Sequence, residues 1–235
     1  ENRRYLDDLL AREAGKGVKL SSELLDGPVV DMLADAIRAH GSDLVVLATH
    51  GRGGFSRFWL GSTATGLIRQ SPAPLLLLRP GEGELLLPLR PKRVLVPVDG
   101  SGFGDAIIQD ALTLGGTEEV EYHVVQVIPP VPVVLSAALP ERDRKHFGER
   151  EAAAVDNLAT VKEGFATRGA TCVASILVAE NVSEELMAYA DREGCDLIAM
   201  GTHGRSGVGR LLIGSVADKV IRGSRVPMLL RGPAA

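Results

Sequence analysis

The sequence predicts an α/β fold made of two tandem copies of an open parallel five-stranded sheet with flanking helices. Residues 41–80 align without a gap on residues 194–233 at a constant offset of 153, and 19 of the 40 pairs are identical. Short apolar segments alternate with longer amphipathic ones, which is typical of a parallel sheet covered on both faces. At the same offset residues 92–153 have no counterpart, so we expect the first copy to lack its N-terminal strands and the chain to be a fragment.

The first half of the second copy is predicted to contain strands over 93–98 and 120–128 and helices over about 102–114 and 141–168. The strand segments are short and rich in β-branched residues. Turn chemistry ends each of them, Asp99-Gly100-Ser101 in one case and Pro129-Pro130 in the other. The second helix is long and charged, with Ala-rich faces.

The second half of this copy is predicted to contain strands over 171–178, 195–200 and 226–230 and helices over 182–193 and 215–222. Asn181, with Glu184 three residues later, predicts a capping box at the start of the first helix. The first copy repeats this half, with strands over 18–25, 44–48 and 75–78. The last strands of the two copies would lie at the sheet edges, and exposed apolar edges are normally covered.

This organisation divides the chain into two domains. Residues 1–79 form the first, incomplete domain, residues 80–91 form a linker rich in Pro and Gly, and residues 92–235 form the second domain.

Composition excludes several classes of function. A net charge of −4 gives no general attraction to nucleic acid or anionic lipid, and 4% aromatic residues leave few platforms for stacking bases. No apolar run approaches the roughly 18 residues of a membrane span. Two cysteines are too few for a disulfide framework and indicate reduced thiols in a cytoplasmic setting.

A glycine pattern in the second copy predicts a phosphate site. Gly201 and Gly204 follow a predicted strand, and after nine residues Gly214-Ser215 opens a predicted helix. Ligands of open parallel sheets bind off the carboxyl ends of the strands. Glycine lets the backbone approach a ligand closely, and a helix N-terminus favours an anion.

These residues resemble the ATP-binding signature of the universal stress protein family, whose two-domain members also match the tandem copies. The likeness covers essentially the whole chain and includes Val-Pro-Val-Asp-Gly-Ser at 96–101. It implies a Rossmann-like fold of the adenine-nucleotide α-hydrolase-like superfamily. The implied ATP contacts are Pro97, Val98, Asp99 and Val127 on the adenine and ribose side, and Met200, Gly201, His203, Gly204, Arg205, Gly214, Ser215, Val216 and Ala217 along the ribose and phosphates.

The first copy departs from this pattern, because Ala48 stands at its first glycine position. Ala is small enough to leave binding open, and the phosphate half of the implied site is retained in Gly51, Arg52, Gly61, Ser62 and Thr63. The second copy is therefore the more secure binder.

Some of these residues also have plainer interpretations. Asp99 could simply end a strand, His203 could be a loop histidine without a ligand, and Arg205 could belong to a solvated charged surface.

The favoured function is that of an ATP-binding stress-response protein, which binds ATP with Mg²⁺ and hydrolyses it slowly at most. Occupancy of the site by ATP would change the conformation of the protein or its binding to partners. The alternatives are a nucleotide-free interaction scaffold and, less favoured, a nicotinamide- or flavin-dependent enzyme. No P-loop, nucleophile elbow or metal-spaced His/Cys set is present, so a dedicated enzyme is not expected. The resemblance implies that the last strands of the two copies pair with each other, which makes the tandem an internal dimer. Association of two chains as a homodimer is left open.

Overall fold

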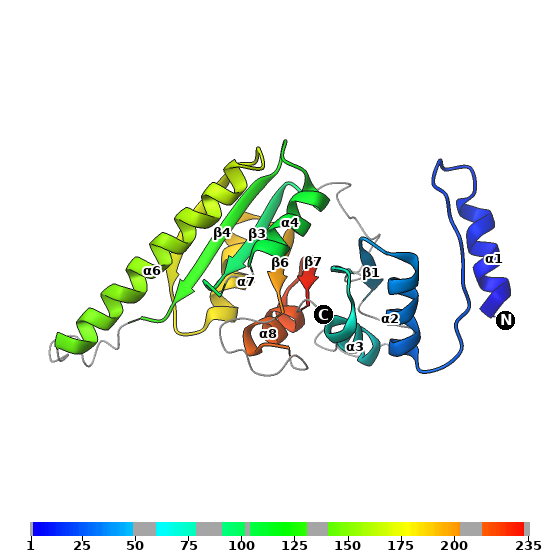
Figure 1. Cartoon of the computed structure of the whole chain (residues 1–235), viewed down its shortest axis with the longest axis horizontal. Coiled ribbons are helices and arrows are strands. Elements are labelled where there is room, and N and C mark those ends of the chain that lie inside the picture. The colour runs from blue at the N-terminus through cyan, green and yellow to red at the C-terminus, as the bar shows by residue number, and fades with distance from the viewer. Residues whose placement is uncertain are drawn as a thin grey trace.

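The computed structural model describes residues 2–48, 60–78, 91–101, 104–130, 141–202 and 213–232. These residues form one seven-stranded sheet in the order β1-β2-β7-β6-β3-β4-β5, with helices on both faces (Figure 1). The predicted α/β fold is confirmed. No helix in the described part of the chain has both the length and the apolar character needed to cross a membrane.

The second copy contributes five strands, and all pairings among them are parallel. The strands are β3 (Arg93–Val98), β4 (Glu121–Ile128), β5 (Cys172–Val178), β6 (Leu197–Gly201) and β7 (Met228–Arg231). The helices between them are α4 (Gly104–Gly115), α6 (Glu141–Ala166), α7 (Val182–Glu193) and α8 (Ser215–Gly223). Every strand and helix predicted for this copy is present, with small shifts at the ends.

Two strands and three helices lie among the described residues of the first copy. They are α1 (Asn2–Glu13), α2 (Val29–His40), β1 (Val45–Ala48), α3 (Ser62–Gln70) and β2 (Leu75–Leu78). The bounds of α2, α3 and β2 are those of α7, α8 and β7 at the offset of 153. The repeat extends to single atoms, because the Ser71 and Ser224 hydroxyls donate to Ala73 O at 2.7 Å and to Val226 O at 3.0 Å.

The strand predicted over 18–25 is wrong, because residues 18–26 form no strand. The equivalent β5 pairs with β4 along its whole length. No counterpart of β4 exists among the described residues of the first copy, so this segment has nothing to satisfy its backbone groups in a sheet. Val18, Leu20 and Leu24 are exposed in consequence.

The predicted capping box at the start of α7 is also wrong. Asn181 is the N-cap residue, but its side chain makes no capping hydrogen bond. Its Oδ1 instead accepts a hydrogen bond from the Ser183 hydroxyl at 2.9 Å.

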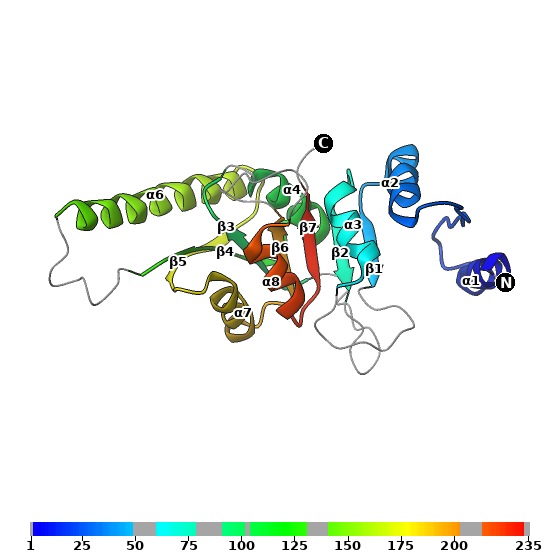
Figure 2. The ribbon, with the colours of Figure 1, turned by 90° about the horizontal axis from the view of Figure 1, so that it is seen from below.

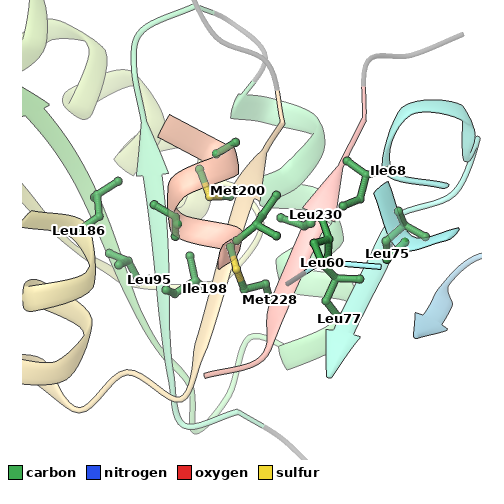
Figure 3. Close-up of a cluster of buried hydrophobic side chains, with 14 of the residues drawn as sticks. Leu60, Ile68, Leu75, Leu77, Leu95, Leu186, Ile198, Met200, Met228 and Leu230 are labelled. Atoms are coloured by element: carbon green, nitrogen blue, oxygen red, sulfur yellow. The ribbon is translucent and has the colours of Figure 1, made fainter. Parts of the chain in front are cut away.

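The two copies join through their last strands, as predicted. β2 and β7 pair antiparallel, with Leu75 opposite Leu230, Leu76 opposite Leu229 and Leu77 opposite Met228. On one face of the sheet a single apolar core continues across this junction, and side chains from both copies meet in it (Figure 3). The division into domains at residues 80–91 remains a prediction, since most of that linker lies outside the described residues.

The helices cover the two faces unequally. α2, α3, α7 and α8 pack on the face whose core contains Leu75 and Leu230, while α4 and α6 pack on the face whose core contains Leu76 and Leu229, and both cores span the two copies. Figure 2 shows α6 and α4 on one side of β3 and β4 and α7 on the other. α1 lies apart from the sheet at the N-terminal end (Figure 1) and buries no residue.

Candidate functional site

The candidate site lies where β3 and β6 end. These strands are parallel neighbours, with Val94 beside Leu197 and Leu95 beside Ile198, so their carboxyl ends reach the same edge of the sheet. Asp99 follows β3 directly, and Thr202 follows β6. This edge is where open α/β sheets place their ligands.

Thr202 fixes three elements at this edge. Its side chain is fully buried, and its N–H and hydroxyl both donate to the carbonyl oxygen of Arg231 at the end of β7, at 2.9 and 3.3 Å. Its own carbonyl accepts the N–H of Gly214 at 2.8 Å. Thr202 was missed as a site residue, although the Thr-His-Gly-Arg run shared by both copies could have pointed to it.

The first turn of α8 lies at this edge, where Gly214 bonds to Thr202. Gly214, its N-cap residue, has φ −58° and ψ 146°, and no side chain caps the helix. The first intrahelical bond runs from Asp218 N–H to Gly214 O at 2.9 Å. The amides of Ser215, Val216 and Ala217 therefore have no partner among the described residues, and the helix dipole makes this end attractive to an anion.

The first copy repeats this helix start. Gly61 has φ −59° and ψ 152°, Thr65 N–H donates to Gly61 O at 2.9 Å, and no side chain caps α3. The surroundings differ: a Cβ atom on Gly214 would lie 3.2 Å from Thr202 O, whereas one on Gly61 would meet nothing within 4 Å. Ser62 and Thr63 supply the amides that correspond to Ser215 and Val216.

Asp99 shapes the turn after β3. Its Oδ1 accepts the N–H of Ser101 at 2.9 Å, and Gly100 between them has φ +75°, a value that favours glycine. The side chain is exposed. The turn interpretation thus accounts for one carboxylate oxygen, and a contact of Asp99 with a ribose stays a prediction.

The remaining predicted residues of the second copy are either half-buried or buried in the core. Pro97 and Val98 end β3 half-buried, and Val98 lies opposite Gln126, the residue before Val127. Val127 and Val216 are half-buried against the core, while the side chains of Met200 (labelled in Figure 3) and Ala217 are buried in it. Met200 and Ala217 can therefore meet a ligand only through their main chain.

An ion pair stands at the same edge beside Thr202. Arg231 Nη1 lies 3.4 Å from Oδ2 of Asp110 on α4, and the two side chains are 31% and 15% exposed. Burial raises the pKa of Asp110, and the nearby Arg231 charge opposes that rise. The sequence offered no periodic or motif signal for this contact between residues 121 positions apart.

Several predicted residues cannot be placed. His203, Gly204 and Arg205 of the second copy and Gly51 and Arg52 of the first lie outside the described residues. Ala48 ends β1 and is exposed. β1 has β2 as its neighbour on one side and no described strand on the other, so the described part of the first copy has no counterpart of β3 or of Asp99, and a phosphate site at the start of α3 stays a prediction.

Comparison with known proteins agrees with this architecture. A family model described as the universal stress protein family matches residues 1–79 and 91–230. The universal stress protein Rv2005c of Mycobacterium tuberculosis (strain ATCC 25618 / H37Rv) is 28% identical over 225 residues, covering 94% of this chain and 72% of the relative. The universal stress protein MJ0531 of Methanocaldococcus jannaschii is 25% identical over 144 residues, covering 59% of this chain and 81% of the relative.

Solved structures show the same fold. A universal stress protein from Archaeoglobus fulgidus DSM 4304 superposes with a TM-score of 0.67 at 20% identity, covering 97% of this chain and 76% of that one. The universal stress protein UspA from Lactobacillus plantarum gives a TM-score of 0.52 at 20% identity, covering 60% of this chain and 97% of that one. The family match spans both copies of the repeat, and the chain belongs to the universal stress protein family.

Proposed function

We propose that this chain is an ATP-binding stress-response protein, in which the second copy holds the nucleotide and occupancy alters conformation or partner binding, with slow hydrolysis at most. The uncapped first turn of α8 is the observation that carries the proposal, because its three amides stand at the carboxyl edge without partners among the described residues. Such a turn suits a phosphate chain. The two free thiols, Cys172 and Cys195, suit a cytoplasmic setting.

Different residues of the second copy would contact different parts of the ATP molecule. The amides of Ser215, Val216 and Ala217 would donate to phosphate oxygens, and the end of β3 would face the ribose and adenine. The described residues contain no cluster of His, Cys, Asp or Glu that could hold a metal ion, so Mg²⁺ is proposed to arrive bound to the phosphates, where it would offset their charge.

One observation favours the alternative, a nucleotide-free scaffold. The Gly214 N–H and one Asp99 oxygen, both at the edge of the candidate site, already have protein partners. A scaffold of this kind would keep the fold and melt at the same temperature with and without ATP.

Ser215→Pro tests the proposal sharply. Proline at the first helical position removes one amide donor and is well tolerated, and the preceding Gly214 already has the extended backbone that proline requires. We expect ATP with Mg²⁺ to raise the melting temperature of the wild-type chain, and Ser215→Pro to weaken ATP binding by about tenfold or more, the loss of one charge-assisted hydrogen bond.

Two variants serve as controls. Ser62→Pro makes the same change in the first copy, where Gly61 is equally extended, and it should leave binding to the second copy intact. Ser215→Ala removes the hydroxyl and keeps the amide, so it should retain most of the affinity. Undiminished binding in Ser215→Pro would overturn the assignment of the site, and an unchanged melting temperature with ATP would overturn the proposed function.

A further inference from the structure

Strand β5 ends the sheet on the side away from β1 (Figure 2). Its seven residues, Cys172–Val178, include no charged residue and no proline. β4 pairs with it along its whole length, and no strand in the described part of the chain pairs with its other side. Natural proteins usually blunt such an edge with charges, proline or a bulge, because its free backbone groups can pair with another chain.

The exposed apolar side chains of the second copy gather at this edge. Among its described residues the large exposed hydrophobic ones are Val155, Val173 and Val178, at 53%, 44% and 57% exposure. Val173 and Val178 belong to β5. Burial raises the pKa of Cys172 on β5, and Lys162 of α6 lies close enough to oppose that rise. Val155 lies on α6 two turns before Lys162, and so on the same flank of the helix.

The backbone of β5 can pair with a second β5. Ala179 N–H donates to Ile128 O on β4, so by alternation the groups of Val173, Ser175 and Leu177 also face β4. The outward groups are then those of Cys172, Ala174, Ile176 and Val178. An antiparallel pair centred on Ser175 sets Ala174 opposite Ile176 and Cys172 opposite Val178, so that every outward residue faces another outward residue.

We propose that two copies of this chain associate through β5, paired antiparallel with itself about a twofold axis at Ser175. The register is self-complementary, it brings no like charges together, and it covers Val173 and Val178. It also brings the Val155 flanks of the two α6 helices toward each other. The chain already uses the same geometry inside the molecule, where β2 and β7 pair antiparallel.

The alternative dimer interface is the opposite edge of the sheet, formed by β1. No strand in the described ranges pairs with the outer side of β1 either, but β1 has four residues, and its large exposed apolar side chain is Val46, at 53%. A ladder there is shorter by three residues on each chain, so the observations favour β5.

Sedimentation velocity over a range of concentrations tests the interface. The wild-type chain should approach twice its 24.9 kDa mass. Val173→Lys/Val178→Lys should sediment as a monomer and keep the circular dichroism spectrum of the wild type, because both side chains are exposed in the single chain. The matched control is Val46→Lys on β1, which should remain dimeric. A wild-type monomer at every concentration, or a dimer lost in Val46→Lys and kept in the double variant, would overturn the proposal.

Cross-linking tests the register. Residues that face each other between hydrogen-bonded pairs have Cα atoms about 4.5 Å apart, within disulfide range, so Ser175→Cys should form a disulfide-linked dimer under mild oxidation. Ala174→Cys should not, because its twofold mate is a diagonal neighbour about 7–8 Å away. Cross-linking of Ala174→Cys with none in Ser175→Cys would refute this pairing.

Discussion

Leu76 of β2 and Leu229 of β7 pair with each other at the centre of the antiparallel ladder, and they are equivalent residues of the two copies at the offset of 153. The flanking pairs are reciprocal, since Leu75 and Leu77 are the equivalents of Met228 and Leu230. A local pseudo-twofold axis therefore passes between Leu76 and Leu229. The junction has the self-matching character of a symmetric dimer interface within one chain.

The leucines on this axis should be energetically coupled. Leu229 is fully buried and Leu76 is 9% exposed, and both belong to the same core cluster. We expect Leu229→Ala to lower the free energy of unfolding by about 2–5 kcal/mol. The double variant Leu76→Ala/Leu229→Ala should depart from additivity by about 0.5–3 kcal/mol, because the two side chains are neighbours in one cluster. Urea unfolding followed by circular dichroism measures Leu76→Ala, Leu229→Ala and the double variant, and additive losses would contradict the coupling.

Gly66 of α3 should tolerate no side chain while Val30 of α2 is present. A Cβ atom at Gly66 would lie 2.6 and 2.8 Å from the two Val30 methyl groups. We expect Gly66→Ala to destabilise the chain by about 1–3 kcal/mol despite the better helix propensity of alanine. Val30→Ala in the Gly66→Ala background should recover part of that loss in thermal unfolding.

Gly223 provides the control for that prediction. A Cβ atom there would lie 2.6 Å from the Met187 sulfur, which belongs to a flexible side chain that can move. Gly223→Ala should therefore cost less than Gly66→Ala. Equal losses in the two variants would show that the rigidity of the neighbour is not what matters.

Tyr122 should govern stability at alkaline pH. Its ring is fully buried, its hydroxyl donates to Gly116 O at 2.6 Å, and burial raises its pKa to about 12. The folded chain favours the neutral phenol, so its stability is complete below the unfolded pKa of about 10 and falls as the pH rises from there toward 12.

Tyr122→Phe tests this dependence. The variant should be less stable by about 1–2 kcal/mol at neutral pH, because buried carbonyls lose their donor. Its stability should then vary less between about pH 9 and 11 than that of the wild type. Melting temperatures of the two proteins measured across this pH range test the prediction. The same dependence on pH in both proteins would contradict it.

Asp110 should destabilise the fold at neutral pH. Burial raises its pKa, so the folded chain holds this proton more readily than the unfolded chain, and stability falls as the pH rises through the raised pKa. We expect Asp110→Asn to raise the melting temperature at pH 7 by up to about 2–4 °C, equivalent to about 1 kcal/mol or less, and to lose this advantage in acid. A lower melting temperature at pH 7 would show that attraction to Arg231 outweighs the cost of burial.

The parts of the fold that could be predicted from the sequence are those that depend on local pattern. Helix α2 and strand β2 were expected because their apolar spacing repeats that of α7 and β7. The strand over 18–25 was expected because this segment aligns with β5 at the offset of 153. It failed because a strand needs a partner, and the alignment carries no information on whether one is present. Asn181 failed as a capping residue because Ser183, two residues away, competes for its side chain.

The candidate site was predictable where glycine spacing marked it, at Gly201 and at Gly214. Arg231 and Asp110 were not predictable, because their contact depends on how α4 lies over the sheet. The part played by Thr202 depends on hydrogen bonds from two other elements, β7 and α8, which no local motif encodes.

The direction of the join between β2 and β7 also has a consequence for communication. Because these strands run in opposite directions, the first turns of α3 and α8 open toward opposite borders of one continuous sheet. Ligands bound at the two helix starts would therefore lie at opposite borders of the sheet. The antiparallel ladder of three residue pairs lies between them, so Leu76 and Leu229 are the residues at which to test whether occupancy of one site affects the other.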